Sequence, residues 1–344
     1  MNKQVLQEIR DDVYRREHFT YLNVSILNPG ASPNLLEAKF VSDLTIPVIE
    51  DPQSYCAAIV SFNCPASSIP IFKFFDNTYR ITLSYLGDDY SEYLTFVSYS
   101  TTDTTTKFVF YIQQFLDSIN NTFVNLFNLL NAAHPGAVNA APYVVYQFGK
   151  FSLIADGLNY NTNLANPVKI FFNQLLFNFF LPIQAFTFGI NLTNFKDVQI
   201  LVKDNGAGSD TGSLTGTTYT MTTEYDPIAL WSFVKSIIVL SSTTGIKNHT
   251  MVTNVFVGSQ QNVNVYQPII ASIDVSINEL NRSSYINFDP KFLTYNDITA
   301  KTPMSSISFR IAFLTKDLSV FPLYLFPSQS AGILVQFKHK TILS

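Results

Sequence analysis

Apolar and polar residues alternate in short segments near both ends of this chain, and this pattern constrains the fold more than any other feature. Every second residue from Ile307 to Phe313 is large and apolar, and a similar alternation runs from Ile269 to Ile277. Successive side chains of a β-strand point to opposite faces, so this period predicts strands with one buried and one wetted face. Both ends of the chain are therefore expected to be β-structure.

Further strands are expected in the first hundred residues, where turn residues separate FTYLNVSIL, EAKFVSDLTIPV and YCAAIVSFNCP. Segment 79–99 predicts a hairpin, because two alternating runs flank Gly87, Asp88 and Asp89. The chain closes with FPLYLFP and GILVQFKHK, which have the same character. Many short strands separated by turns predict a β-sandwich.

One central segment has a helical period instead. From Phe108 to Leu130 apolar residues recur every three or four positions, which predicts a long amphipathic helix with its aromatic stripe in a core. Because this helix interrupts the run of strands, we predict a mainly β chain, a single β-sandwich with a large inserted β-rich domain. The expected boundaries are 1–17 for an N-terminal arm, 18–99 with 225–344 for the sandwich, and 100–224 for the insertion.

The expected arm holds eight of the 46 charged side chains in the protein. Val5, Ile9 and Val13 recur at a spacing of four, as on one face of a helix. An arm that orders against a neighbouring subunit and a frayed terminus both fit this pattern. If the arm docks, the candidate interface residues are Val5, Ile9, Val13, Arg15 and Arg16.

The composition also bears on assembly. Charged residues make up 13% of the chain, against a usual share of about a quarter, whereas aromatic residues reach 15%. Such a chain must wet its surface with Ser, Thr and Asn or cover that surface with other subunits. The composition favours a protein that assembles.

Several classes of partner are not expected. The net charge is −4 and no run of Lys and Arg is longer than Arg15-Arg16. The sequence therefore does not predict a basic face that binds nucleic acid specifically. The N-terminus lacks the apolar segment of a secretory signal, which favours synthesis in the cytosol. Amides and Pro182 interrupt the apolar region 170–190, so we expect a buried strand and a short core helix there, not a membrane span.

No pattern typical of catalysis occurs in the sequence. The four histidines lack a second ligand at metal spacing, and no phosphate-binding glycine loop or nucleophile elbow is found. Cys56 and Cys64 are expected to be small apolar side chains. We therefore expect no enzyme activity, no metal and no cofactor. The histidines are His18, His134, His249 and His339.

The order of several segments adds a resemblance. A strand ends in the proline-containing turn NCPASSIPIF, and the hairpin YRITLSYLGDDYSEYLTF follows. The middle of the chain contains FYIQQFLDSINNTFVNLF, KIFFNQLLFNFF and EYDPIALWSFVKSIIVLSS, and the end is ISFRIAFLTKDLSVFPLYLFPSQSAGILVQFKHK. This order resembles the penton, or minor capsid, proteins of polinton-like viruses and virophages. Ser328 stands where the family pattern has glycine after proline.

The resemblance implies a jelly-roll structural virion protein made in the host cytoplasm. It implies a homopentamer at the vertices of an icosahedral capsid, in contact with the major capsid protein, and an outward insertion for which a host receptor is a candidate partner. Two alternatives stay open: another capsid component, although a double jelly-roll major capsid protein normally needs a longer chain, and a non-viral glycan-binding β-sandwich. Trp231 is the only tryptophan, and its place at the start of an expected strand favours a core position.

Overall fold

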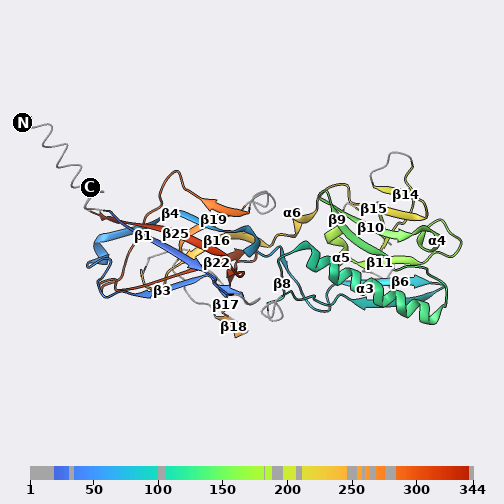
Figure 1. Cartoon of the computed structure of the whole chain (residues 1–344), viewed down its shortest axis with the longest axis horizontal. Helices are drawn as coiled ribbons and strands as arrows, with labels where there is room; N and C mark the ends of the chain where they lie inside the picture. Colours follow the sequence, from blue (N-terminus) through green and yellow to red (C-terminus); the bar gives the residue numbers. More distant parts are fainter. Residues whose placement is uncertain are drawn as a thin grey trace, which may run out of the picture. The chain divides into compact units, whose positions relative to one another are not determined.

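The computed structural model describes residues 19–30, 35–99, 106–181, 183–187, 197–206, 211–245, 254–257, 260–263, 269–275 and 284–340. These residues form two compact units (Figure 1). The sandwich unit takes the described residues up to Ile69 and from Phe233 onward, and the inserted unit takes those of 70–99 and 106–232. Each unit is described by itself.

The sandwich unit has two antiparallel main sheets. The first has the order β1 (Phe19–Leu27), β25 (Ser330–His339), β4 (Tyr55–Pro65) and β20 (Tyr285–Phe288), and β21 (Asn296–Asp297) also pairs with β4. The second has the order β3 (Lys39–Asp43), β22 (Ser306–Thr315), β16 (Val234–Leu240) and β19 (Ile269–Asp274). Without β21, these eight strands have the order 1-8-3-6 in one sheet and 2-7-4-5 in the other. This is the topology of a jelly roll, as expected.

Shorter elements complete the sandwich unit. Strand β23 (Ser319–Pro322) pairs with β22 on the same side as β3. From β23 the sheet continues to β17 (Asn254–Val257) and then to β18 (Gln260–Val263). A small ladder joins β2 (Leu36–Glu37) to β24 (Tyr324–Leu325). Two 3-10 turns, η1 (Pro52–Ser54) and η2 (Ala66–Ser68), flank β4.

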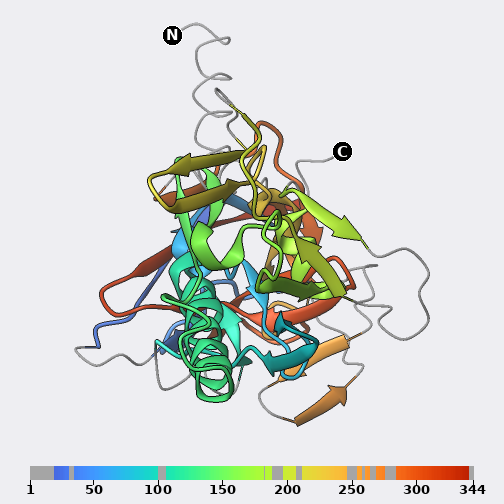
Figure 2. The same ribbon diagram turned by 90° about the vertical axis from the view of Figure 1, so that its right-hand side faces the viewer.

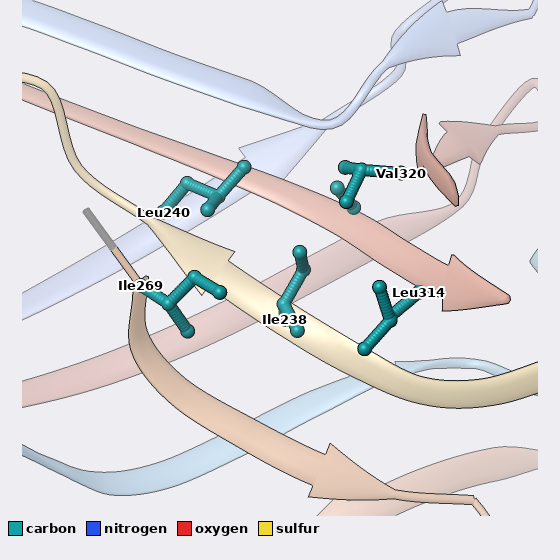
Figure 3. Close-up of a cluster of buried hydrophobic side chains, with 6 residues drawn as sticks. Ile238, Leu240, Ile269, Leu314 and Val320 are labelled. Atoms are coloured by element: carbon teal, nitrogen blue, oxygen red, sulfur yellow. The ribbon is translucent and has the colours of Figure 1, made fainter. Parts of the chain in front are cut away.

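Strand β16 is buried on both faces. Ile237 and Val239 point to one side of the sheet, Ile238 and Leu240 point to the other, and none is more than 3% exposed. On the second side, Ile238 and Leu240 cluster with Ile269, Ala312, Leu314 and Val320 (Figure 3). The apolar run of β16 therefore fits a central strand covered on both faces.

The inserted unit also has two main sheets. One has the order β12 (Ala185–Thr187), β13 (Asp197–Ile200), β11 (Lys169–Asn173), β6 (Arg80–Tyr85) and β7 (Asp88–Tyr93). The other has the order β14 (Gly212–Thr215), β15 (Thr218–Thr222), β10 (Lys150–Asp156) and β9 (Tyr143–Gln147). The long helix α3 (Ile112–Ala133) lies against β6 and β7 of the first sheet and β9 of the second (Figure 2). Short helices are α4 (Gly157–Tyr160), α5 (Gln174–Phe177), η3 (Asn178–Phe180) and α6 (Ile228–Trp231).

The predicted helix is present, but it begins four residues later than expected. Phe108 and Val109 form β8 (Phe108–Val109), which pairs with β5 (Phe72–Lys73), so the helical period does not start there. Within α3 the apolar stripe is buried as predicted. Its members are Phe115, Leu116, Ile119, Phe123, Leu126 and Leu130.

The division between the units differs from the expected boundaries. Hairpin β6–β7 belongs to the inserted unit, because β6 pairs with β11 with Leu83 opposite Ile170. The later boundary lies after Ser232, since α6 also belongs to the inserted unit. Alternation predicts a hairpin but carries no information about which sheet it joins, and this explains why the expected boundary at residue 99 is displaced.

The apolar region that begins at Ile170 forms β11, α5 and η3 as far as Phe180. This is the strand and short core helix that the sequence predicts, with Phe172, Leu176 and Phe180 buried. In the part of the chain that the structure describes, no helix combines the length and the hydropathy needed to cross a membrane.

Candidate functional site: the assembly surfaces

The polar side chains of the described residues do not meet the requirements of a metal site. Among the described residues, no three His, Cys, Asp or Glu side chains gather so that they could hold a metal ion. On the surface of the inserted unit, His134 Nε2 lies 3.0 Å from Asp88 Oδ2, and the rings of Tyr85 and Tyr90 pack edge-on against the imidazole. One carboxylate and one imidazole make a surface contact but do not complete a metal ligand set.

The two cysteines are structural. Cys56 and Cys64 are both free and buried, and both belong to β4. Burial raises the pKa of the Cys64 thiol to about 12, which keeps it protonated and unreactive. Both therefore pack as small apolar side chains, as the sequence predicts.

Trp231 is part of the core of the inserted unit. It is 7% exposed, and its indole is surrounded by the rings of Phe72, Phe115, Phe151 and Phe179. The expected core position of this tryptophan is confirmed. An indole covered in this way cannot offer its face to a sugar, so the glycan-binding alternative loses its only tryptophan.

The outer face of the first sandwich sheet is polar and aromatic. The alternation of β1 points Tyr21 outward, where its hydroxyl accepts a hydrogen bond of 2.5 Å from Gln336 Nε2. The Tyr295 hydroxyl donates to Gln336 Oε1 at 2.6 Å, and Lys338 Nζ lies 5.3 Å from the centre of the Tyr295 ring. This face is thus covered by one connected set of polar and aromatic side chains with a single cation.

The register of the sheet brings this set together. Tyr21 lies opposite Gln336, and Phe19 lies opposite Lys338, although more than 300 residues separate the partners in sequence. The sequence pattern indicates which residues point outward, but only the pairing of β1 with β25 places them side by side. The expected interface residues Val5, Ile9, Val13, Arg15 and Arg16 lie outside the described residues, which begin at Phe19.

Two hairpin tips of the inserted unit are apolar and exposed. Leu86 has φ +53° and is 63% exposed, and Phe148 has φ +52° and is 101% exposed. A glycine, Gly87 or Gly149, follows each of them. A bulky side chain in the left-handed region is an outlier, and such strain is found preferentially at functional positions. The tips are therefore candidate contact points that hydrophobic periodicity does not reveal.

Together these features define a class of protein. A jelly roll with an inserted unit, a polar and aromatic face on one sheet and exposed apolar tips offers surfaces for contact and, among the described residues, no cluster for metal chemistry. This combination is typical of a structural shell protein.

Comparison with known proteins specifies the family. The family model described as Sputnik minor capsid protein V18/19 matches residues 20–339. The chain therefore belongs to the Sputnik minor capsid protein V18/19 family. It is a structural component of a virophage capsid, not an enzyme, and the resemblance found in the sequence is confirmed.

Solved structures share the fold. A chain of the Sputnik virophage particle, determined by cryo-EM, is 22% identical with a TM-score of 0.70, and the match covers 95% of this chain and 99% of the other. The mavirus penton protein, determined by crystallography, is 12% identical with a TM-score of 0.60, with coverage of 93% and 99%. No curated protein sequence matches the chain.

Proposed function

We propose that this minor capsid protein is the penton of its particle. Five copies form a ring at each vertex of an icosahedral capsid, and the ring contacts the major capsid protein. The observation that carries this proposal is the fold shared with the mavirus penton protein over 99% of that chain. A contact that uses two different patches of each copy closes into a ring when the rotation that relates neighbouring copies fits a whole number of times into a full turn.

The surface chemistry of the sandwich unit supports a role between subunits. On the outer face Tyr21, Gln336 and Tyr295 are joined by hydrogen bonds, so burying these three side chains against a neighbour leaves few of their polar groups unpaired. The low overall charge supports the same role, because charged residues are depleted at the cores of interfaces.

The remaining parts of the chain take supporting roles in this proposal. The arm, through Val5, Ile9, Val13, Arg15 and Arg16, docks on a neighbouring subunit. The inserted unit, residues 70–99 and 106–232, is an outward domain whose exposed tips Leu86 and Phe148 offer contacts to a host receptor. The protein is made in the host cytoplasm and makes no specific contact with nucleic acid.

The test is the mass of the purified chain, measured by native mass spectrometry or sedimentation, alone and after co-expression with the major capsid protein. A closed pentamer, and particles with this chain at their vertices when imaged by electron microscopy, are the expected results. A chain that stays monomeric and is absent from particles formed by the major capsid protein contradicts the proposal.

The arm has its own test. Deletion of residues 1–17 should leave the circular dichroism spectrum and the melting temperature of the chain unchanged but reduce its incorporation into particles. The matched control replaces Gln4 and Gln7 by Ala, which keeps the length of the arm and its five candidate interface residues and should leave incorporation unchanged. If the deletion unfolds the chain, the arm belongs to the fold and does not act as a docking peptide.

A further inference from the structure

One edge of the jelly roll is open. Strand β20 ends at Phe288 and β21 begins at Asn296, so the middle of β4 has no paired strand on that side among the described residues. A groove of about 230 Å³ lies at this break, with Ile59 of β4 and Ile270 of β19 among its lining residues. Both isoleucines are only 4% exposed, so the groove reaches the buried core.

The loop that borders the groove carries an exposed aromatic residue. Phe292 contributes to the lining and is 89% exposed, which makes it the most exposed of the large apolar side chains described in the sandwich unit. Phe288 and Pro290 add to the apolar wall. An apolar cavity of about 150 Å³ holds a benzene ring, so this groove has room for one branched or aromatic side chain.

The opposite edge of the same sandwich has projecting apolar residues. β1 and β3 lie at the other ends of the two four-stranded orders and contact each other, whereas residues of β19 and β20 line the groove. On this edge Ile46, in the loop after β3, is 77% exposed, and Val41 on β3 and Leu27 on β1 are each 55% exposed. One edge thus offers a cavity and the other edge offers side chains of the size that fits it.

We propose that the groove between β19 and the β20–β21 loop receives Ile46 from the β1–β3 edge of a second copy of this chain. The contact is head-to-tail and uses both edges of every sandwich unit. It rests on the proposed pentamer, for which it names the contacting surfaces. Because the two patches are different and lie on opposite edges, each copy can bind one neighbour at each edge, as a ring requires.

The charges on the two edges support a second copy as the occupant. Asp289 and Lys291 are exposed beside Phe292, and Lys39 and Asp43 are exposed on either side of Val41. Each edge therefore has one acid and one base beside an exposed apolar residue, which is Phe292 at the groove and Val41, five positions before Ile46, on β3. Oppositely charged pairs can form in a head-to-tail contact, and such rim charges guide association and orientation.

Cysteine cross-linking tests the contact. A chain carrying both Ile46→Cys and Phe292→Cys should form disulfides between copies on mild oxidation and give a ladder that ends at the pentamer. The two positions lie on opposite edges of one unit, too far apart to join within a copy. The controls are the two single variants, which should not cross-link, and the two native cysteines are buried.

The outcomes separate this inference from the proposed function. A native pentamer without the ladder overturns the edge contact and leaves the pentamer standing. A chain that is monomeric both alone and with the major capsid protein, and gives no ladder, overturns both. A third chain carries Phe292→Cys and Ile9→Cys. If these two cysteines cross-link and the pair Ile46→Cys and Phe292→Cys gives no ladder, the arm occupies the groove and the proposal is overturned.

Point variants provide an independent measure. Phe292→Gln and Ile46→Gln should each weaken self-association at least tenfold in sedimentation equilibrium, without a change in melting temperature, because both side chains are exposed. The matched control is Leu129→Gln on α3, where the side chain is 52% exposed and belongs to neither edge. Association that is unchanged in both edge variants, or lowered equally by the control, overturns the proposal.

Discussion

The ring of Phe151 stacks on the indole of Trp231, with centroids 4.8 Å apart and planes inclined by 30°. Phe115 and Phe179 meet the same indole edge-on, at 5.6 and 4.9 Å. These four aromatic residues come from β10, α6, α3 and η3. The single tryptophan is therefore the point at which separate elements of the inserted unit are held together, and aromatic pairs of this geometry stabilise beyond their buried area.

Trp231→Ala is expected to lower the free energy of unfolding of the inserted unit by about 3–5 kcal/mol, the usual cost of a large aromatic truncation in a core. Hydrogen exchange measures it by comparing peptides from α3 with peptides from β22. Protection should fall in α3 and stay unchanged in β22, which belongs to the other unit. The control Leu129→Ala, at an exposed position, should change neither. Equal loss in both units would show that they unfold as one.

Phe148→Asn is expected to stabilise the chain by about 0.5–1 kcal/mol. The tip Phe148-Gly149 has φ values of +52° and +75°, the left-handed pair in which Asn-Gly is preferred, and the phenyl ring loses no packing because it is fully exposed. Chemical denaturation checks the sign. Phe151→Asn on the adjacent strand serves as the contrast, since that ring is buried and its loss should destabilise strongly. A destabilised Phe148→Asn variant would mean that this ring is packed.

Ser328→Gly is expected to raise the free energy of unfolding by roughly 0.5 kcal/mol. Ser328 has φ +64°, and a left-handed backbone costs an L-residue about 1–2 kcal/mol, part of which the greater freedom of glycine in the unfolded chain cancels. The same position departs from the glycine of the family pattern. The melting temperature provides the measurement, with Ser330→Gly in β25 as a control that should destabilise. A lower melting temperature for Ser328→Gly would rule out backbone strain at this site.

Asp317→Asn is expected to reduce the loss of stability in acid. The hydroxyl of Thr315 holds the pKa of the Asp317 carboxyl below its ordinary value of 3.8, and the backbone and hydroxyl of Ser319 also donate to it. A lowered folded pKa stabilises the fold above the unfolded pKa, and this contribution disappears as the pH falls through the folded value. The free energy of unfolding, measured from neutral to acid pH, should therefore fall less steeply with decreasing pH in the variant. Asp89→Asn at an exposed position of β7 is the control, and an equal effect there would contradict a specific role for Asp317.

Much of the local structure follows from sequence. The strand expected from FTYLNVSIL is β1 (Phe19–Leu27), and the aromatic stripe of the central helix is buried from Phe115 to Leu130. These expectations are confirmed because the backbone alone sets how often side chains point to the same face of a strand or a helix. The helix start is displaced because Phe108 pairs with β5, and that strand partner is distant in sequence.

The candidate contact surfaces, which are the hairpin tips and the groove, were harder to predict from the sequence. No local pattern distinguishes Phe148 as an exposed tip, because an apolar residue between two strands equally fits a buried position. The sequence signal that could have identified both tips is a bulky residue directly before glycine between alternating runs, as in Leu86-Gly87 and Phe148-Gly149. The groove beside Phe292 has no such signal, since it depends on the break between β20 and β21.

The sequence by itself determined a mainly β chain with one long amphipathic helix, a core position for Trp231 and a surface poor in charge. Local periodicity and composition are sufficient for these conclusions. Only the tertiary structure decided that hairpin β6–β7 joins β11, that Tyr21 meets Gln336, and that a groove and a set of projecting side chains lie on opposite edges of the jelly roll. The physical reason is that strand pairing and register depend on which distant surfaces are buried together, and alternation is the same whichever partner a strand takes.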